Sequence, residues 1–228
     1  MNAQANPKTV VIVGAGFAGL NAAKALGHSA DVKIILIDRR NYHLFQPLLY
    51  QVATAALSPA EIAEPIRSIL ADNSNTRVLL DNVTAIDVAA KRVSTPTESF
   101  VYDFLILACG AKHSYFAHPE WETFAPGLKT VEQATEIRRR ILMAFELAER
   151  EEDLDRQKAF QTFIIVGGGP TGVEIAGAIS EISRTTLERD FRRIDPSHTR
   201  VILIEAGPRI LASFSEKLAK RAARDLER

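Results

Sequence analysis

The sequence predicts an α/β protein that contains two units of the same kind, each made of a strand, a helix and a second strand. Three observations support this fold class. A β-branched run over 9–13 leads into Gly14 and an Ala- and Leu-rich segment over 17–26 with helical spacing, and a second β-branched run over 32–37 ends on Asp38. The same order of elements recurs in the second half of the chain. Each unit is therefore expected to pair its strands in parallel through a right-handed crossover.

Further elements are expected in the first unit. A helix is expected over 59–70, because Ser58, Pro59 and Glu61 supply an N-cap, a first-turn proline and a capping box. A β excursion follows, and the apolar run 104–108 is expected to form a fully buried strand. The short strands of the excursion are expected over 76–80, 83–88, 91–94 and 99–101.

A long amphipathic helix is expected to join the two units, followed by a charged, solvated hinge over 149–158. The apolar positions of this helix are Val131, Ala134, Ile137, Ile141, Phe145 and Ala148. The second unit is expected to comprise a strand over 162–166, a helix over 170–187, a strand over 200–204 that ends on Glu205, and a last helix from 216 to 228. The resulting domain boundaries are 1–120, 121–160 for the connecting helix and hinge, and 161–228.

The composition excludes several classes of function. The 228 residues are 46% hydrophobic, which is enough for a sizeable core, and 28 basic residues balance 28 acidic ones, which argues against nucleic acid as a partner. The single cysteine, Cys109, excludes an internal disulfide, a dithiol redox pair and a multi-cysteine metal site. A single cysteine fits a reducing cytosolic compartment. The histidines do not have a metal-ligand spacing, so no metal site is expected. No secretory signal or apolar run of about 18 residues is seen.

Gly14, Gly16 and Gly19 form a G-x-G-x-x-G loop between the first strand and its helix. In such a loop the first glycine permits a tight turn, the second lets the backbone approach a pyrophosphate, and the third lets the helix pack on the strand. Phosphates then sit at the positive end of the helix. Asp38, at the end of the second strand, is placed to accept hydrogen bonds from an adenosine ribose.

The second unit repeats this loop with Gly167, Gly169 and Gly172, and Glu205 is its terminal acid. An acid at that position attracts a free 2′-hydroxyl and repels a 2′-phosphate, so NADH is favoured over NADPH, although Arg209 lies nearby in the sequence. Two Rossmann-like dinucleotide-binding units predict one resident and one exchanging nucleotide. FAD as the resident and NADH as the exchanging nucleotide are the simplest pair that fits, because a flavin accepts a hydride and passes its electrons to another partner.

The sequence resembles the two-dinucleotide-binding-domain flavoproteins and, among them, type II NADH dehydrogenase, a single-subunit NADH:quinone oxidoreductase. The specific segments are Asn41 to Tyr50 (NYHLFQPLLY), Ser114-Tyr115-Phe116, Trp121, Ala125 to Thr130 (APGLKT), Glu136 to Arg140 (EIRRR) and Asp190 to Pro196 (DFRRIDP). The resemblance implies a non-proton-pumping respiratory-chain oxidoreductase that passes electrons from NADH through FAD to a membrane quinone.

The resemblance also assigns site residues. The segment 41–50 is expected near the flavin ring, and Glu174, in the first turn of the second helix, near the nicotinamide and the flavin. Glu174 and His43 are the candidate catalytic residues; their alternatives are an acid stabilised by the helix dipole and a histidine that packs or bonds to backbone. The cofactor-binding residues are expected to be Gly14, Gly16, Phe17, Ala18, Gly19, Asp38, Arg39, Gln46, Pro47, Ala108, Cys109, Gly110, Ala111, Gly167, Gly169, Pro170, Thr171, Gly172 and Glu205.

The chain departs from the family pattern in two respects. Cys109 stands where the family often has threonine, and a buried small hydrophobe is the favoured interpretation of its thiol. The second Rossmann-like unit is incomplete at its C-terminus, so we expect a truncated chain that lacks the second flavin-contacting segment, the quinone-site residues and a C-terminal amphipathic membrane anchor. The full-length protein is then expected to be peripheral on the cytoplasmic face of the inner membrane.

Two other functions stay open at this point. One is a flavoprotein reductase whose acceptor is a ferredoxin- or rubredoxin-type protein, and the other is a truncated, non-catalytic remnant. Disulfide reductases and sulfide:quinone oxidoreductases need redox cysteines, so a chain with Cys109 alone excludes both. The sequence does not decide between a monomer and a homodimer.

Overall fold

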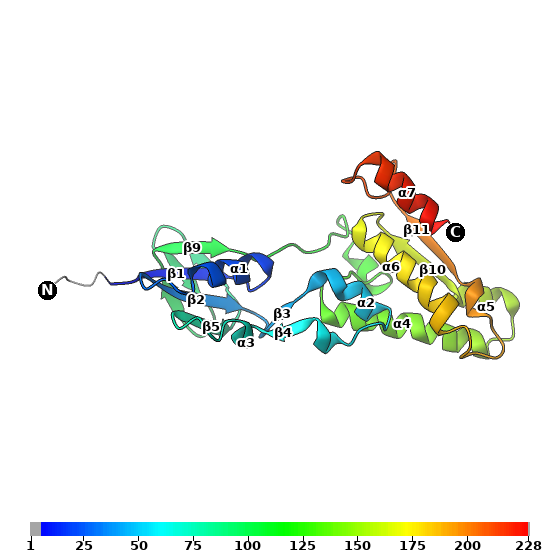
Figure 1. The fold of residues 1–228 in the computed structure, drawn as a ribbon, viewed down its shortest axis with the longest axis horizontal. Coiled ribbons are helices and arrows are strands. Elements are labelled where there is room, and N and C mark those ends of the chain that lie inside the picture. Colours follow the sequence, from blue (N-terminus) through cyan, green and yellow to red (C-terminus); the bar gives the residue numbers. More distant parts are fainter. Residues whose placement is uncertain (1–5, 228) are drawn as a thin grey trace. The chain divides into compact units, whose positions relative to one another are not determined.

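The computed structural model describes residues 6–227, which form two compact units (Figure 1). Unit 1 comprises 6–45 and 60–112, and unit 2 comprises 46–59 and 113–227. The α/β fold class is confirmed, and each strand–helix–strand repeat lies inside one compact unit.

Unit 1 is built on a four-stranded parallel sheet in the order β5-β2-β1-β9. The strands are β1 (Lys8–Val13), β2 (Val32–Asp38), β5 (Thr76–Leu80) and β9 (Phe104–Leu107), and α1 (Phe17–Leu26) is the crossover between β1 and β2. Alternate residues of β1 and β2 point to opposite faces, and each face has its own core. One core combines Val10, Ile12, Ile34 and Leu36 with Leu20 and Ala23 of α1, and the other combines Val11, Val13, Ile35 and Ile37 with Val93, Phe100 and Tyr102.

The second core is closed by the predicted β excursion. It is a three-stranded antiparallel sheet of β6 (Ala85–Asp87), β7 (Arg92–Ser94) and β8 (Ser99–Val101). The strand over 76–80 was expected in this excursion, but it pairs with β2 and belongs to the parallel sheet as β5. The expectation that 104–108 is fully buried is wrong, because β9 lies at the edge of the parallel sheet and Phe104 and Leu107 are about 60% exposed.

The predicted helix over 59–70 is also wrong. A 3₁₀ turn, Pro59–Glu61, starts at the expected place, but the chain then forms β4 (Ala63–Pro65) and a one-turn helix, α3 (Ile66–Ile69). Proline at position 65 disfavours a helical residue before it and has no N–H for a helical bond. The segment instead pairs antiparallel with β3 (Tyr42–Leu44) and buries Ile62.

Unit 2 is organised around the predicted long helix, α4 (Val131–Arg150), which begins at the Thr130 cap. Its expected apolar stripe is buried at Ala134, Ile141, Phe145 and Ala148. Phe145 is 1% exposed and its ring lies near those of Phe163 and Phe191. The short helix α2 (Leu49–Ala53) packs on α4, preceded by a 3₁₀ turn, Gln46–Leu48.

The charged run 149–158 is mostly exposed, as expected, but part of it forms a helix. Asp153 accepts the N–H groups of Asp155 and Arg156 at 2.9 and 3.0 Å and so caps a further helix, α5 (Leu154–Phe160). Glu149 is half-buried and accepts the backbone N–H groups of the segment 192–194. Acids of this run therefore satisfy helix and loop amides, a role that charge alone does not reveal.

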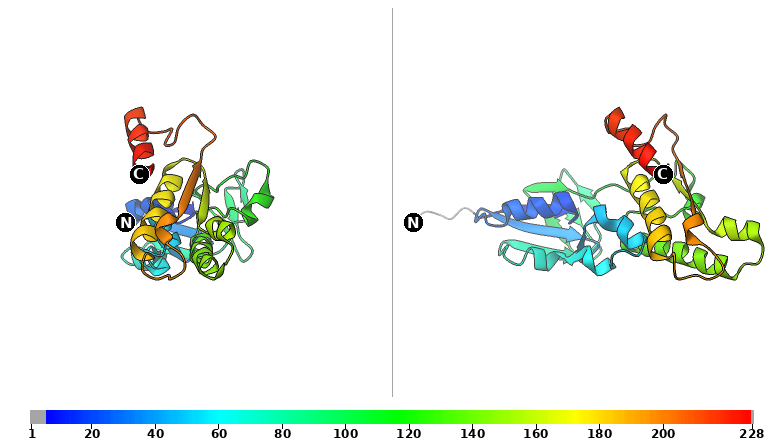
Figure 2. Two further views of the ribbon diagram at one scale, coloured as in Figure 1. Left: turned by 90° about the vertical axis from the view of Figure 1, so that its right-hand side faces the viewer. Right: turned by 45° about the vertical axis from the view of Figure 1, so that its right-hand side comes forward.

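The second strand–helix–strand repeat consists of the parallel strands β10 (Thr162–Val166) and β11 (Arg200–Ile204), joined through α6 (Pro170–Glu181). Figure 2 shows α6 running alongside this strand pair. The expected helix over 170–187 is confirmed in extent, and its last turn, Ile182–Thr186, is π-helical. The remaining elements of unit 2 are two 3₁₀ turns, Pro119–Thr123 and Pro196–His198, and α7 (Glu216–Leu226). In the described range, no helix is long and apolar enough to cross a membrane.

Glu136 on α4 gives a testable prediction on charge. Its carboxylate accepts bonds from Arg139 at 2.8 Å and from Arg140 at 2.7 Å, and these bonds lower the pKa of Glu136 from 4.5 to about 2. Because the folded pKa lies below the unfolded one, the stabilisation is present above pH 4.5 and is lost as the pH falls towards 2. A carboxyl-carbon NMR titration should therefore show Glu136 with a midpoint near 2.

The matched control is Glu146→Gln, an exposed acid of the same helix. Glu136→Gln should remove the low-pH signal, and Glu146→Gln should leave it in place. A Glu136 midpoint at the ordinary value of 4.5 would contradict the Arg139 and Arg140 bonds.

Candidate functional site

The first glycine loop makes a tight turn between β1 and α1. Gly14 has φ +98°, a conformation that L side chains rarely adopt, and its N–H donates to Ile37 O at 2.8 Å. A Cβ at Gly14 would lie 2.4 Å from Ala108 O, so Ala108 at the end of β9 packs directly on the turn. The loop thus sits where three parallel strands end.

The third glycine, Gly19, brings α1 against the same turn. A Cβ at Gly19 would lie 1.8 Å from Gly14 O, whereas one at Gly16 would meet nothing within 4 Å. Gly16, Phe17 and Ala18 are exposed, no side chain caps α1, and its first turn carries no acid. The helix end therefore presents N–H groups without a negative side chain in its first turn, as a phosphate site requires.

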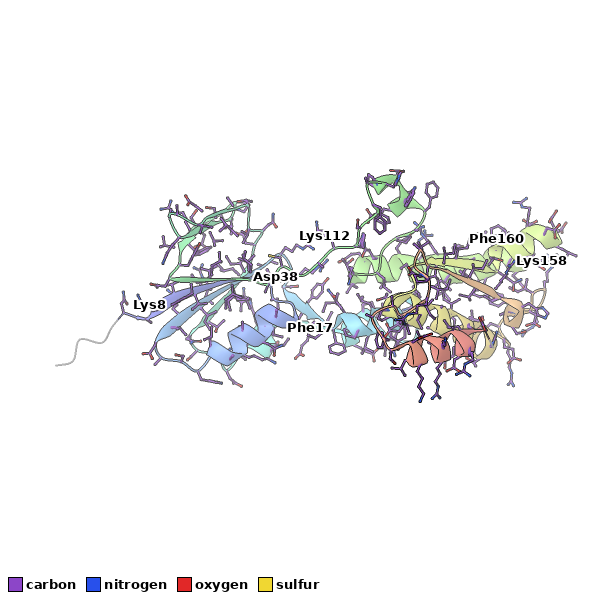
Figure 3. All side chains as sticks on the ribbon, turned by 90° about the horizontal axis from the view of Figure 1, so that it is seen from above. Lys8, Phe17, Asp38, Lys112, Lys158 and Phe160 are labelled. Carbon is purple, nitrogen blue, oxygen red and sulfur yellow. The ribbon has the colours of Figure 1, made fainter. Side chains whose placement is uncertain are left out.

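Asp38 lies beside this loop, at the end of β2 (Figure 3). One carboxylate oxygen accepts the N–H of Ala15 at 2.6 Å and the other accepts the N–H of Arg40 at 2.8 Å. The adjacent Arg39 is exposed. The sequence motif did not predict the amide of Ala15 as a partner of Asp38.

The second loop has the same geometry in unit 2. Gly167 has φ +106° and donates to Ile204 O at 2.7 Å. A Cβ at Gly172 would lie 1.9 Å from Gly167 O, and one at Gly169 would meet nothing within 4 Å. No side chain caps α6, which starts at Pro170 with no acid in its first turn, and Thr171 is exposed.

Glu205 completes the second loop. Its carboxylate accepts the N–H of Gly207 at 2.7 Å and of Gly168 at 2.6 Å, and these bonds lower the pKa of Glu205. Arg209 donates to the carbonyls of Leu211, Ala212 and Phe214, so its guanidinium is engaged by the backbone. An ionised acid, with Arg209 held by backbone carbonyls, suits a ribose that carries a 2′-hydroxyl.

His43 faces the first loop from β3. Its Nδ1 lies 3.0 Å from Ala15 O, and its ring meets Phe17 edge-on at 5.0 Å. The contact fits the alternative to catalysis that the sequence left open, a histidine that packs or bonds to backbone. Because it engages Nδ1, any proton chemistry of His43 would use the other ring nitrogen, Nε2. A catalytic role for His43 stays a prediction.

The structure corrects the expectation for Cys109, which is exposed rather than buried. It follows β9 at the sheet edge, and its Sγ lies 3.8 Å from Val13 O. Gly110 and Ala111 are exposed next to it, and Gly110 has φ +70°. The segment 108–111 thus presents backbone groups beside the first loop.

Glu174 is the fifth residue of α6, so it lies beyond the first turn where it was expected. Burial raises its pKa, which is opposite to the effect of a helix N-terminus on an acid. It lines an open cleft of about 460 Å³ in unit 2 together with Tyr50, Glu181 and Asp225. Tyr50 and Glu174, assigned near the flavin and the nicotinamide, are therefore brought together, and Gln46 and Pro47 are exposed on the turn before α2.

No group of three or more histidines, cysteines or carboxylates that could hold a metal occurs among residues 6–227. The two loops do fit a dinucleotide. Each offers open backbone at the second glycine, an uncapped helix start and an acid at the end of the second strand.

Comparison with known proteins agrees with this geometry. The model of the pyridine nucleotide-disulphide oxidoreductase family matches residues 8–228. The chain is 51% identical to the type II NADH:quinone oxidoreductase Ndh of Mycobacterium tuberculosis and 52% identical to NdhA of the same organism, in each case over 96% of its own length. The resemblance drawn from the sequence is therefore confirmed.

A solved structure of NDH2 from Plasmodium falciparum in complex with NADH has a TM-score of 0.85 at 25% identity and covers 97% of this chain. The chain spans 48% and 47% of the two mycobacterial relatives and 47% of the Plasmodium chain. It therefore corresponds to about half of each of these proteins.

The close approach of the third glycine leads to a prediction on stability. Gly172→Ala places a Cβ against the fixed carbonyl of Gly167, so we expect the free energy of unfolding to fall by about 2 kcal/mol or more. Gly169→Ala, which enters open space, should change it by less than about 1 kcal/mol. Urea unfolding of the nucleotide-free chain measures both, and equal effects would contradict the close contact.

Proposed function

The chain belongs to the pyridine nucleotide-disulphide oxidoreductase family, and from this premise we propose that it forms the nucleotide-binding part of a type II, flavin-dependent NADH:quinone oxidoreductase. The observation that carries the proposal is the repeat of one glycine-loop geometry in both units. The two mycobacterial relatives, which are type II NADH:quinone oxidoreductases, and the NADH complex of the Plasmodium protein support the choice of NADH and quinone as substrates. Cys109 alone provides no cysteine pair for disulfide chemistry.

We assign FAD to the loop of unit 1 and NADH to the loop of unit 2. The division into 1–120 for FAD, 161–228 for NADH and 121–160 as the connection is part of this proposal. FAD, when bound, accepts two electrons as a hydride and passes them on to a different partner. The backbone N–H groups at the start of α1 and α6 bind the phosphates, and Asp38 and Glu205 accept ribose hydroxyls.

The protein groups also set the cofactor preference and hold protons. Glu205 repels a 2′-phosphate, and Arg209 is held by carbonyls, so NADH is preferred over NADPH. Partial desolvation raises the pKa of Glu174, so it holds a proton at higher pH than an acid with the ordinary pKa. We assign His43 to proton handling at the nucleotide of unit 1 and Glu174 to proton handling at the nucleotide of unit 2. We assign the whole protein to a membrane, because its proposed quinone substrate is lipid-soluble, and to the cytoplasmic face of that membrane. Fractionation of the full-length protein tests the membrane association.

The test is an anaerobic absorbance titration of the 228-residue chain reconstituted with FAD. NADH should bleach the bound flavin band, and a soluble quinone should restore it. Retained flavin that NADH does not bleach would contradict the NADH assignment. Flavin that is reoxidised by a rubredoxin-type protein but not by quinone would instead identify a protein-acceptor reductase.

Two matched variants separate the sites. A Cβ at Gly16 or Gly169 enters the space left for a phosphate without a clash in the protein. Gly16→Ala should weaken FAD retention by about tenfold, and Gly169→Ala should leave FAD bound and slow flavin reduction by NADH by about tenfold. If both variants affect the same nucleotide, the assignment of one nucleotide to each unit is wrong.

A further inference from the structure

Each strand-end acid bonds to its own glycine loop. Asp38 accepts from Ala15, the residue after the first glycine of loop one, at 2.6 Å. Glu205 accepts from Gly168, the residue after the first glycine of loop two, also at 2.6 Å. The same bond therefore forms twice, at equivalent positions, from acids of different length.

The second oxygen of each carboxylate is engaged as well. Asp38 binds the N–H of Arg40 at 2.8 Å, and Glu205 binds the N–H of Gly207 at 2.7 Å. Each carboxylate thus bridges its loop to the backbone that leaves the second strand.

The bonded amides lie in buried residues, since Ala15 is 2% exposed and Gly168 is also buried. A buried N–H that loses its partner is costly, so the loop shape depends on the acid. The residue at this position also matches the acid. A Cβ at Gly168 would lie 3.1 Å from the Glu205 carboxylate and 2.8 Å from Ile210, whereas loop one, with the shorter Asp38, holds an alanine.

We propose that Asp38 and Glu205 are positioning residues: each accepts a hydrogen bond from the amide after the first glycine, a bond that we call the clasp, and so holds its loop in the phosphate-binding shape. The inference rests on the proposed function for the identity of the ligand, but the clasp itself is made by protein groups alone. The ribose hydroxyls then bind to acids that are already fixed by the backbone.

The test is amide hydrogen exchange by NMR on the nucleotide-free, ¹⁵N-labelled chain. Glu205→Ala should accelerate exchange at Gly168 by about tenfold to a hundredfold and leave Ala15 unchanged. Asp38→Ala should do the reverse, so each variant is the control for the other. Glu205→Gln keeps one acceptor oxygen and should give an intermediate rate at Gly168, and the β1 and β10 strand amides should stay protected in every variant.

Three results would overturn the proposal. Unchanged exchange at Gly168 and Ala15, with NADH affinity still reduced in Glu205→Ala by fluorescence titration, would show that the acid acts on the ribose alone. Acceleration of both loops by either single variant would show a general loss of structure. An unprotected Gly168 amide in the wild-type chain would show that the bond does not persist. If exchange responds as expected but NADH does not bind the wild-type chain, the clasp stands and the proposed function fails.

Discussion

Both units depend on one close contact, between the third glycine of the loop and the carbonyl of the first. Gly19 lies against Gly14, and Gly172 against Gly167, at distances that leave no room for a Cβ. This contact lets the helix start immediately after the strand, so its first N–H groups point at the space beyond the sheet end. The uncapped helix starts and the strand-end acids are useful only because this contact puts them side by side.

The elements whose residues follow a simple hydrophobic periodicity could be predicted from the sequence. Residues 9–13, 17–26 and 32–37 obey simple periodicity, and the structure differs by a residue at most. The prediction of a helix over 59–70 was wrong because the three local start signals were outweighed by Pro65 and by pairing with β3, which is a tertiary contact. The exposure of Phe104 and of Cys109 could not be inferred, because an apolar run does not say whether its strand is central or at an edge.

Part of the site could be predicted and part could not. The glycine spacing located both loops, since it reflects backbone constraints that act over a few residues. The partners of the acids depend on distances across the fold, so the bonds from Ala15 and Gly168 were not visible in the motif. The cleft that joins Tyr50 to Glu174 likewise requires α2 to pack next to α6, and nothing local in the sequence encodes that contact.

The tight fit between Gly168 and Glu205 bears on attempts to change nucleotide preference by design. Removing Glu205 to admit a 2′-phosphate takes away a loop support together with a charge, so a single replacement alters two properties at once. A redesign that keeps the loop must supply another acceptor for the Gly168 amide, and the short side chain of Asp38 next to Ala15 shows one workable geometry. The two loops share a motif, but Ala15 is paired with the shorter Asp38 and Gly168 with the longer Glu205. The two loops are therefore not interchangeable.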